Sequence, residues 1–177
     1  MKKFIFLSML LVMIFCNVKI CSAENLVRVS DYTVNEFYRE YNNVANNVTR
    51  NYIIANEYPI LGKDGINYNN YLMFCGSYGK VTSVILRANK EGHVSAISIM
   101  TPMNSQESVN VGTGVLKNII IVLGLPEITG QIMLEDIING KNPTFQYCYG
   151  TQRYIFMKAF FDKASGLYTT DLYAAVD

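Results

Sequence analysis

Two cysteines in apolar surroundings and a single histidine are the residues of this chain that could most readily do covalent chemistry. Cys75 lies in the stretch FCGSYG and Cys148 in FQYCYG, and His93 follows Cys75 by 18 residues. A thiol becomes a nucleophile when a nearby base or positive charge lowers its pKa. Cys75 and His93 could therefore serve a thiol hydrolase, provided that the loop with His93 folds back toward Cys75.

The stretch FCGSYG resembles the start of the papain-type signature C-G-[SA]-C-[WY], but only over three residues. The signature has a second cysteine where this chain has Tyr78 and an aromatic residue where it has Gly79. Papain-like enzymes place their histidine and asparagine about 130–150 residues after the cysteine, and here only 102 residues follow Cys75. The sequence therefore does not assign the chain to this family.

The N-terminus has the three-part layout of a secretory signal peptide. Two lysines precede the apolar run Phe4–Cys16, and small residues end at Ala23. An uncleaved anchor would need about 20 apolar residues, more than this run offers, so we expect cleavage after Ala23. The short basic start is typical of bacteria, and the product would be periplasmic or secreted. We divide the chain into a signal peptide, residues 1–23, and one domain, residues 24–177.

The two cysteines that remain after cleavage favour a disulfide. Cys16 and Cys21 lie in the expected signal peptide, which leaves Cys75 and Cys148. Disulfides persist in export compartments, and this one would stabilise the fold by roughly 4 kcal/mol on chain-entropy grounds. A Cys75–Cys148 disulfide is the favoured prediction, with two buried free thiols or a reactive Cys75 as the alternatives.

Charge argues against a nucleic-acid partner. Loss of residues 1–23 removes three of the 15 basic side chains and leaves 12 against 14 acidic ones. A net charge of about −2, without a run of like charges, offers no basic face for phosphates or for anionic lipid. We expect neither nucleic-acid binding nor stable membrane insertion after signal cleavage.

No metal or cofactor is expected either. One histidine and two separated cysteines do not form a zinc ligand set. The stretch KDGINYNN at 63–70 lacks the glycine and glutamate positions of an EF-hand loop. VGTG at 111–114 is too short for a dinucleotide fingerprint, and Ser77 does not lie in a G-x-S-x-G motif.

The first half of the domain reads as a helix followed by strands. Thr33 and Glu36 form a capping box, and apolar residues at helical spacing predict a helix over Thr33–Asn46. A short strand is possible at Asn51–Ala55. Three strands are then expected between Tyr71 and Met100, in YLMFC, KVTSVILRA and HVSAISIM, with a hairpin loop at NKEG.

The second half begins with a longer helix after Pro102, with a cap at Asn104 and an end at Gly124. Gly112 and Gly114 each cost about 1 kcal/mol inside a helix relative to alanine. They indicate either close approach to another element or a later helix start.

The rest of the chain completes an α+β pattern. A shorter helix is expected over Thr129–Asn139, followed by strands in TFQYCY, RYIFMKAFF and LYTTDLYAAV. The order α-βββ-αα-βββ favours a single small α+β domain with an antiparallel sheet, an N-terminal helix and a central helical pair. An aromatic-Cys-Gly phrase precedes a strand in both halves, which leaves an internal duplication open.

These observations favour binding over catalysis. No catalytic set is evident, and the chain has 13 tyrosines and many asparagines, which can form adaptable binding surfaces. We expect an exported, non-catalytic binding or accessory protein of the cell envelope or extracellular space, with a protein or envelope component as its partner. The alternatives are an exported thiol hydrolase using Cys75 with His93 and a purely structural envelope protein.

Overall fold

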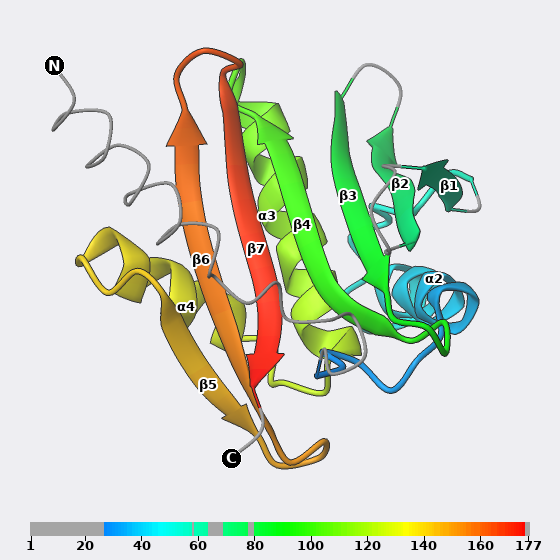
Figure 1. Ribbon diagram of the computed structural model, residues 1–177. Helices are drawn as coiled ribbons and strands as arrows, with labels where there is room; N and C mark the ends of the chain where they lie inside the picture. Colours follow the sequence, from blue (N-terminus) through cyan, green and yellow to red (C-terminus); the bar gives the residue numbers. More distant parts are fainter. Residues whose placement is uncertain (1–26, 58, 64–68, 78–79, 176–177) are drawn as a thin grey trace, which may run out of the picture.

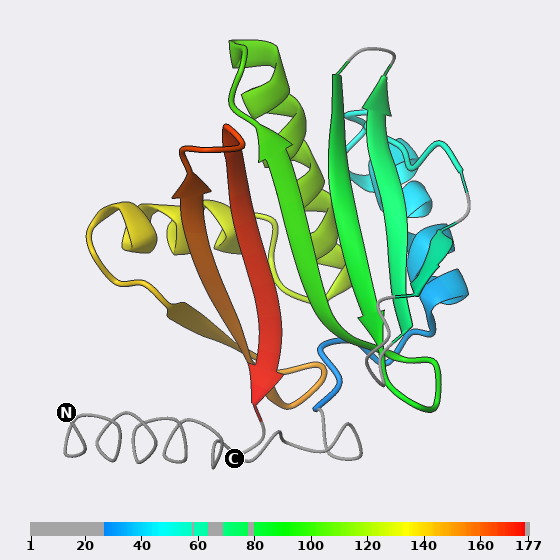
Figure 2. The ribbon, with the colours of Figure 1, turned by 45° about the horizontal axis from the view of Figure 1, so that its top comes forward.

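One antiparallel sheet of seven strands forms the front layer of the protein, and the helices lie behind it (Figure 1, Figure 2). The computed structural model describes residues 27–57, 59–63, 69–77 and 80–175, so the expected signal peptide lies outside the described residues. The strand order is β1-β2-β3-β4-β7-β6-β5. The strands are β1 Ile60–Lys63, β2 Asn69–Ser77, β3 Lys80–Ala88, β4 Val94–Pro102, β5 Thr144–Cys148, β6 Arg153–Asp162 and β7 Leu167–Ala175.

The helical layer contains three α-helices and one π-helical turn among the described residues. They are α2 Val34–Asn43, the π-helix η2 Val44–Val48, α3 Gln106–Val122 and α4 Thr129–Ile138. The predicted α+β class and the order α-βββ-αα-βββ are confirmed, and the four-residue β1 is an additional strand at one edge.

The first helix forms where its cap predicts. Thr33 Oγ1 accepts a hydrogen bond from the Glu36 amide, and the Glu36 carboxylate accepts one from the Thr33 amide at 2.9 Å. This reciprocal pair satisfies helix N–H groups that have no intrahelical partner. Beyond η2 the chain takes a positive φ at Arg50 and at Tyr52. Since an extended run does not tolerate such a φ, the strand predicted at Asn51–Ala55 is reduced to a single bridge from Ala55 to β2.

A buried polar cluster fixes this irregular segment against α3. Asn118 is fully buried on α3, and its Oδ1 accepts hydrogen bonds from Thr49 Oγ1 at 2.8 Å and from Asn51 Nδ2 at 2.9 Å. Tyr41 of α2 donates its hydroxyl to the Ile53 carbonyl at 2.7 Å. Buried polar groups need such partners, so this cluster sets where residues 49–53 lie.

Helix α3 packs across the middle of the sheet at unusually close range. Its cap is Ser105, whose Oγ accepts from the Ser108 amide at 3.1 Å, and not Asn104 as predicted. Both glycines lie inside the helix. A Cβ on Gly112 would overlap Thr101 of β4, and a Cβ on Gly114 would meet the tip of Ile53. Close approach, rather than a late helix start, therefore explains the glycines.

The two halves of the sheet are equivalent at a spacing of 73 residues. Strand β7 begins and ends 73 residues after β4, and Cys148 follows Cys75 by the same number. Each half is a three-stranded meander, β2-β3-β4 or β5-β6-β7, and β4 pairs with β7 to join them. Ser98 and Asp171 are both cross-strand partners and equivalent positions. A pseudo-twofold axis perpendicular to the sheet therefore passes through this pair, which supports an internal duplication.

The contrast between the two glycines gives a stability test. In Gly112→Ala the new Cβ would lie 2.8 Å from Thr101 Cβ, a branched atom fixed on β4, so we expect a net destabilisation of about 1–3 kcal/mol from overpacking. In Gly114→Ala only the movable end of Ile53 is in the way, and we expect a neutral or slightly stabilising change, because alanine favours the helix by up to about 1 kcal/mol. Urea unfolding of both variants measures this difference. Equal effects of the two substitutions would contradict the close packing of α3 on β4.

Candidate functional site

The predicted disulfide between Cys75 and Cys148 is wrong for this structure, where both residues are free and buried. Cys75 lies on β2 and Cys148 on β5, five strand spacings apart in the sheet order. At about 4.8 Å per spacing the two are separated by roughly 24 Å. A disulfide needs Cα atoms within about 7 Å of each other, so the sheet topology keeps these cysteines apart.

The surroundings of Cys75 make it a poor nucleophile. The side chain is fully buried beside Tyr41, and burial raises the pKa of the Cys75 thiol to about 12, against a weaker opposing effect of a hydrogen bond with Tyr41. Cys148 Sγ lies 3.4 Å from the Leu123 carbonyl, to which the thiol donates a hydrogen bond at the end of α3. Both thiols therefore act as packed core groups.

His93 does not meet Cys75. It lies in the hairpin loop before β4, where it forms a bridge with Thr33, and its Nδ1 is 3.5 Å from a Glu91 carboxylate oxygen. Cys75 pairs with Thr82, six residues along β3 from the hairpin end at Ala88. Six residues of strand span roughly 20 Å. The Cys–His pair that the hydrolase alternative requires is thus not assembled.

The other sequence motifs have structural placements. VGTG at 111–114 lies in the middle of α3, and most of the stretch 63–70 lies outside the described residues. Within the described part of the chain, no group of three or more His, Cys, Asp or Glu side chains could hold a metal ion. None of the described helices is long and apolar enough to span a membrane.

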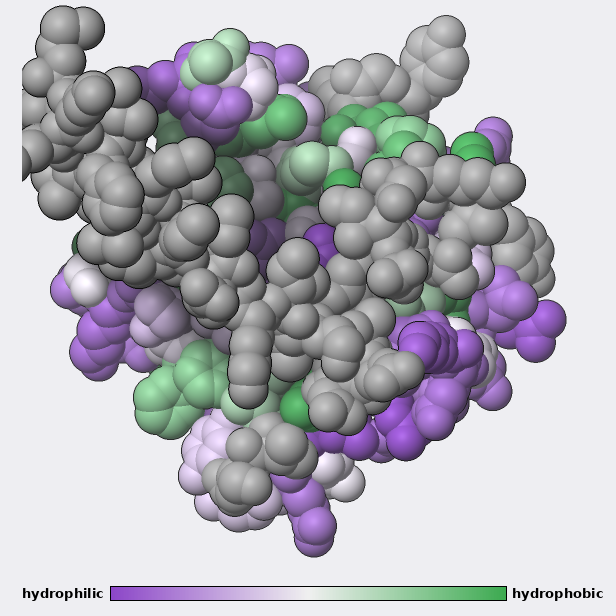
Figure 3. All heavy atoms as spheres, viewed as in Figure 1, coloured by the Kyte–Doolittle hydropathy of each residue, from purple (hydrophilic) through white to green (hydrophobic). Residues whose placement is uncertain are grey.

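The front of the sheet, which we call the open face, carries a cluster of aromatic side chains from the second meander. Ring centroids lie 5.0–5.8 Å apart, and Phe156 stacks on Tyr173 at 5.4 Å. Phe145 remains 55% exposed and Tyr149 85% exposed. Figure 3, which looks onto this side, shows apolar side chains at the surface. The aromatic cluster consists of Phe145, Tyr147, Tyr149, Tyr154, Phe156 and Tyr173.

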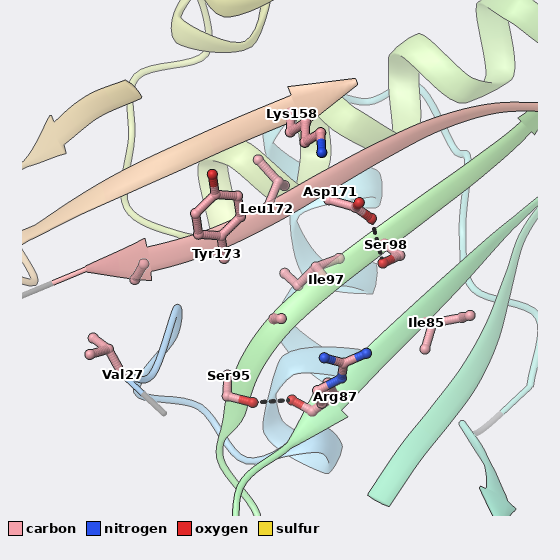
Figure 4. A pocket seen from close by; sticks show the side chains of 12 residues that line it. Val27, Ile85, Arg87, Ser95, Ile97, Ser98, Lys158, Asp171, Leu172 and Tyr173 are labelled. Carbon is pink, nitrogen blue, oxygen red and sulfur yellow. Dashed lines mark hydrogen bonds between the residues drawn. The ribbon is translucent and has the colours of Figure 1, made fainter. Parts of the chain in front are cut away.

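A hollow of about 320 Å³ lies beside this cluster at the centre of the open face. On its floor the Ser98 hydroxyl donates to an Asp171 carboxylate oxygen at 2.6 Å, at the pseudo-twofold axis (Figure 4). Arg87 from β3 and Lys158 from β6 enter from opposite sides, and Tyr173 forms part of the wall. The hollow exists because the central strand β4 presents small side chains here.

The charges around the hollow are unequal. Two cations, Arg87 and Lys158, line it with one carboxylate, Asp171. Within the described residues Lys158 makes no ion pair. An apolar wall with a few convergent polar groups is the usual composition of a binding site. This arrangement can hold and orient a polar or anionic group next to an aromatic surface.

A second depression, of about 270 Å³, lies on the helical side between α3, α4 and the sheet. Its lining is almost wholly apolar, and it lacks a charged side chain that could orient a ligand. The lining includes Met103, Val109, Leu116, Leu134, Ile138 and Tyr168. We therefore take the open face, with its hollow and aromatic cluster, as the candidate site.

Sequence reasoning found the tyrosines as a group but missed the hollow. The only available signal was the alternation of small or polar residues at 96, 98, 169 and 171 in two apolar strands. Comparisons with known protein families, with characterised proteins and with solved structures find no match for this chain. The site is accordingly argued from its own geometry.

Thiol labelling tests the reassignment of the cysteines. Because burial holds the Cys75 pKa near 12, we expect iodoacetamide at pH 7.5 to label neither Cys75 nor Cys148 in the folded protein and to label both in guanidinium. Peptide mass spectrometry reads each site, with glutathione as the reactivity control. A cross-linked peptide holding both cysteines would contradict the strand order, and rapid labelling of Cys75 alone would restore the hydrolase alternative.

Proposed function

We propose that this protein is an exported, non-catalytic binding module whose open face binds another protein. The single observation that carries this proposal is the aromatic cluster on an uncovered sheet face. An antiparallel sheet with one face in water normally presents polar side chains there. A contiguous exposed apolar patch instead marks an interaction surface, and aromatic residues and arginine are enriched at protein interfaces.

The dimensions of the open face suit a protein partner. Strands β2, β3, β4, β7 and β6 are each nine or ten residues long. With strands about 4.8 Å apart and a rise of about 3.3 Å per residue, they cover roughly 700 Å². One side of a standard protein–protein interface buries about 800 Å². The open face is therefore large enough for a stable complex.

Export and the place of action rest on the N-terminal sequence. The basic start, the apolar run Phe4–Cys16 and the small residues ending at Ala23 support cleavage and release into the periplasm or the medium. The partner would then be a protein of the cell envelope or of the extracellular space.

Photo-cross-linking from the two layers tests the proposed interface. p-Benzoylphenylalanine in place of Tyr149, at the edge of the aromatic cluster, should yield one discrete adduct in producing cells. The same group in place of Ile138, which is 80% exposed on α4, is the matched control and should yield none. Phe160→Asp on the open face should lower the Tyr149 adduct at least fivefold, whereas Ile132→Asp on α4 should not. Capture from Ile138 alone would move the interface to the helical layer and contradict the proposal.

A further inference from the structure

We propose that the hollow binds a carboxylate side chain of the partner, held between Lys158 and Arg87 with its apolar stem against Tyr173. This inference rests on the proposed function and specifies what the open face recognises. It follows from three properties of the hollow, namely its position, its charge and its wall.

The position of the two cations follows from the strand register. Lys158 pairs with Asp171, which pairs with Ser98, so Lys158 lies one strand outward from the central pair on β6. Arg87 pairs with Ala96 and lies one strand outward on β3. Figure 4 shows both side chains ending toward the central pair from opposite sides. A group seated over Ser98 is therefore approached by two cations at once.

The centre of the hollow is open because the residues beneath it are small. Ala96 and Ser98 of β4 lie between the longer Ile85 and Arg87 of β3 on one side and Tyr173 of β7 on the other. A volume of about 320 Å³ is at the lower end of the range of small-molecule pockets, roughly 300–1,000 Å³. It accommodates one large side chain of a partner.

The charge balance favours a single negative charge. Asp171 offsets one of the two cations, and one of its oxygens already accepts from Ser98, so the hollow carries a net charge of about +1. A carboxylate completes this balance, and a guanidinium can bind it through two parallel hydrogen bonds. A phosphate, with a charge of about −1.5 to −2, would exceed the balance and be repelled by Asp171.

The wall favours a carboxylate with an apolar or aromatic neighbour. Tyr173 lines the hollow, stacks on Phe156 and continues into the aromatic cluster without a break. A partner segment can thus place its acidic side chain in the hollow and an adjacent apolar side chain on the aromatic cluster. Charge pairs of this kind fix register and partner choice at an interface.

A pair of isosteric probes tests the hollow directly. Phenylacetate carries an aromatic ring and a carboxylate, and phenylacetamide is its neutral match. In an amide-resolved NMR titration of the purified exported protein, we expect phenylacetate to shift Ser98, Asp171 and Tyr173 and to bind at least fivefold more tightly than phenylacetamide. Inorganic phosphate should bind more weakly than phenylacetate.

Two variants connect the effect to the hollow. Lys158→Met removes the charge at similar length and should abolish the preference for phenylacetate over phenylacetamide. Lys163→Met, in the turn between β6 and β7, is the control and should leave the preference unchanged. Ser98→Leu fills the hollow and should abolish binding of both probes, with a retained melting temperature as the check on folding.

The outcomes separate this inference from the proposed function. Equal binding of the two probes, or no shifts on the open face, overturns the carboxylate site even if the Tyr149 adduct forms and the interface stands. If the adduct forms and Lys158→Met lowers it about fivefold, the partner supplies the carboxylate. If phenylacetate binds selectively but Lys158→Met leaves the adduct unchanged, the hollow takes a free carboxylic acid, and recognition of a partner side chain is overturned.

Discussion

The pairing of β4 with β7 is the constraint on which the rest of the structure depends. Seven residue pairs join the two meanders into one sheet, and α3 lies over the β4 side of that junction. The helix can approach so closely because Gly112 has no side chain to meet Thr101. With the helices on one side, the other side of the junction remains uncovered, and the small residues of β4 leave a hollow there.

Local signals predicted the elements well, and non-local geometry explains what they missed. The capping box at Thr33 and the β-branched runs act within a few residues, so helices and strands could be placed from sequence. The disulfide failed because strand order decides which strands are neighbours, and Cys75 and Cys148 ended up on distant strands. Ser105 rather than Asn104 caps α3, a difference of one residue that depends on where the chain leaves β4.

The candidate site was even less accessible to sequence reasoning. Ser98 and Asp171 are 73 residues apart and meet only through the register between β4 and β7. The facing of the strand after His93 was also ambiguous, since a β-bulge at Arg87 and Ala88 shifts the alternation and both Val94 and Ser95 are buried. Composition could indicate that tyrosines were abundant, but only the sheet shows that aromatic residues gather on one half of one face.

The pseudo-twofold axis has a consequence for how a partner can sit. A rotation of half a turn about this axis leaves the backbone of the open face nearly unchanged, so the main chain alone offers two docking poses of equal shape. Side chains remove that ambiguity. Lys158 is equivalent to Ile85, and the aromatic positions Phe156 and Tyr173 are equivalent to Ser83 and Met100. Polarity of docking is thus written entirely in the divergence of the two halves, while their shared backbone keeps the platform intact.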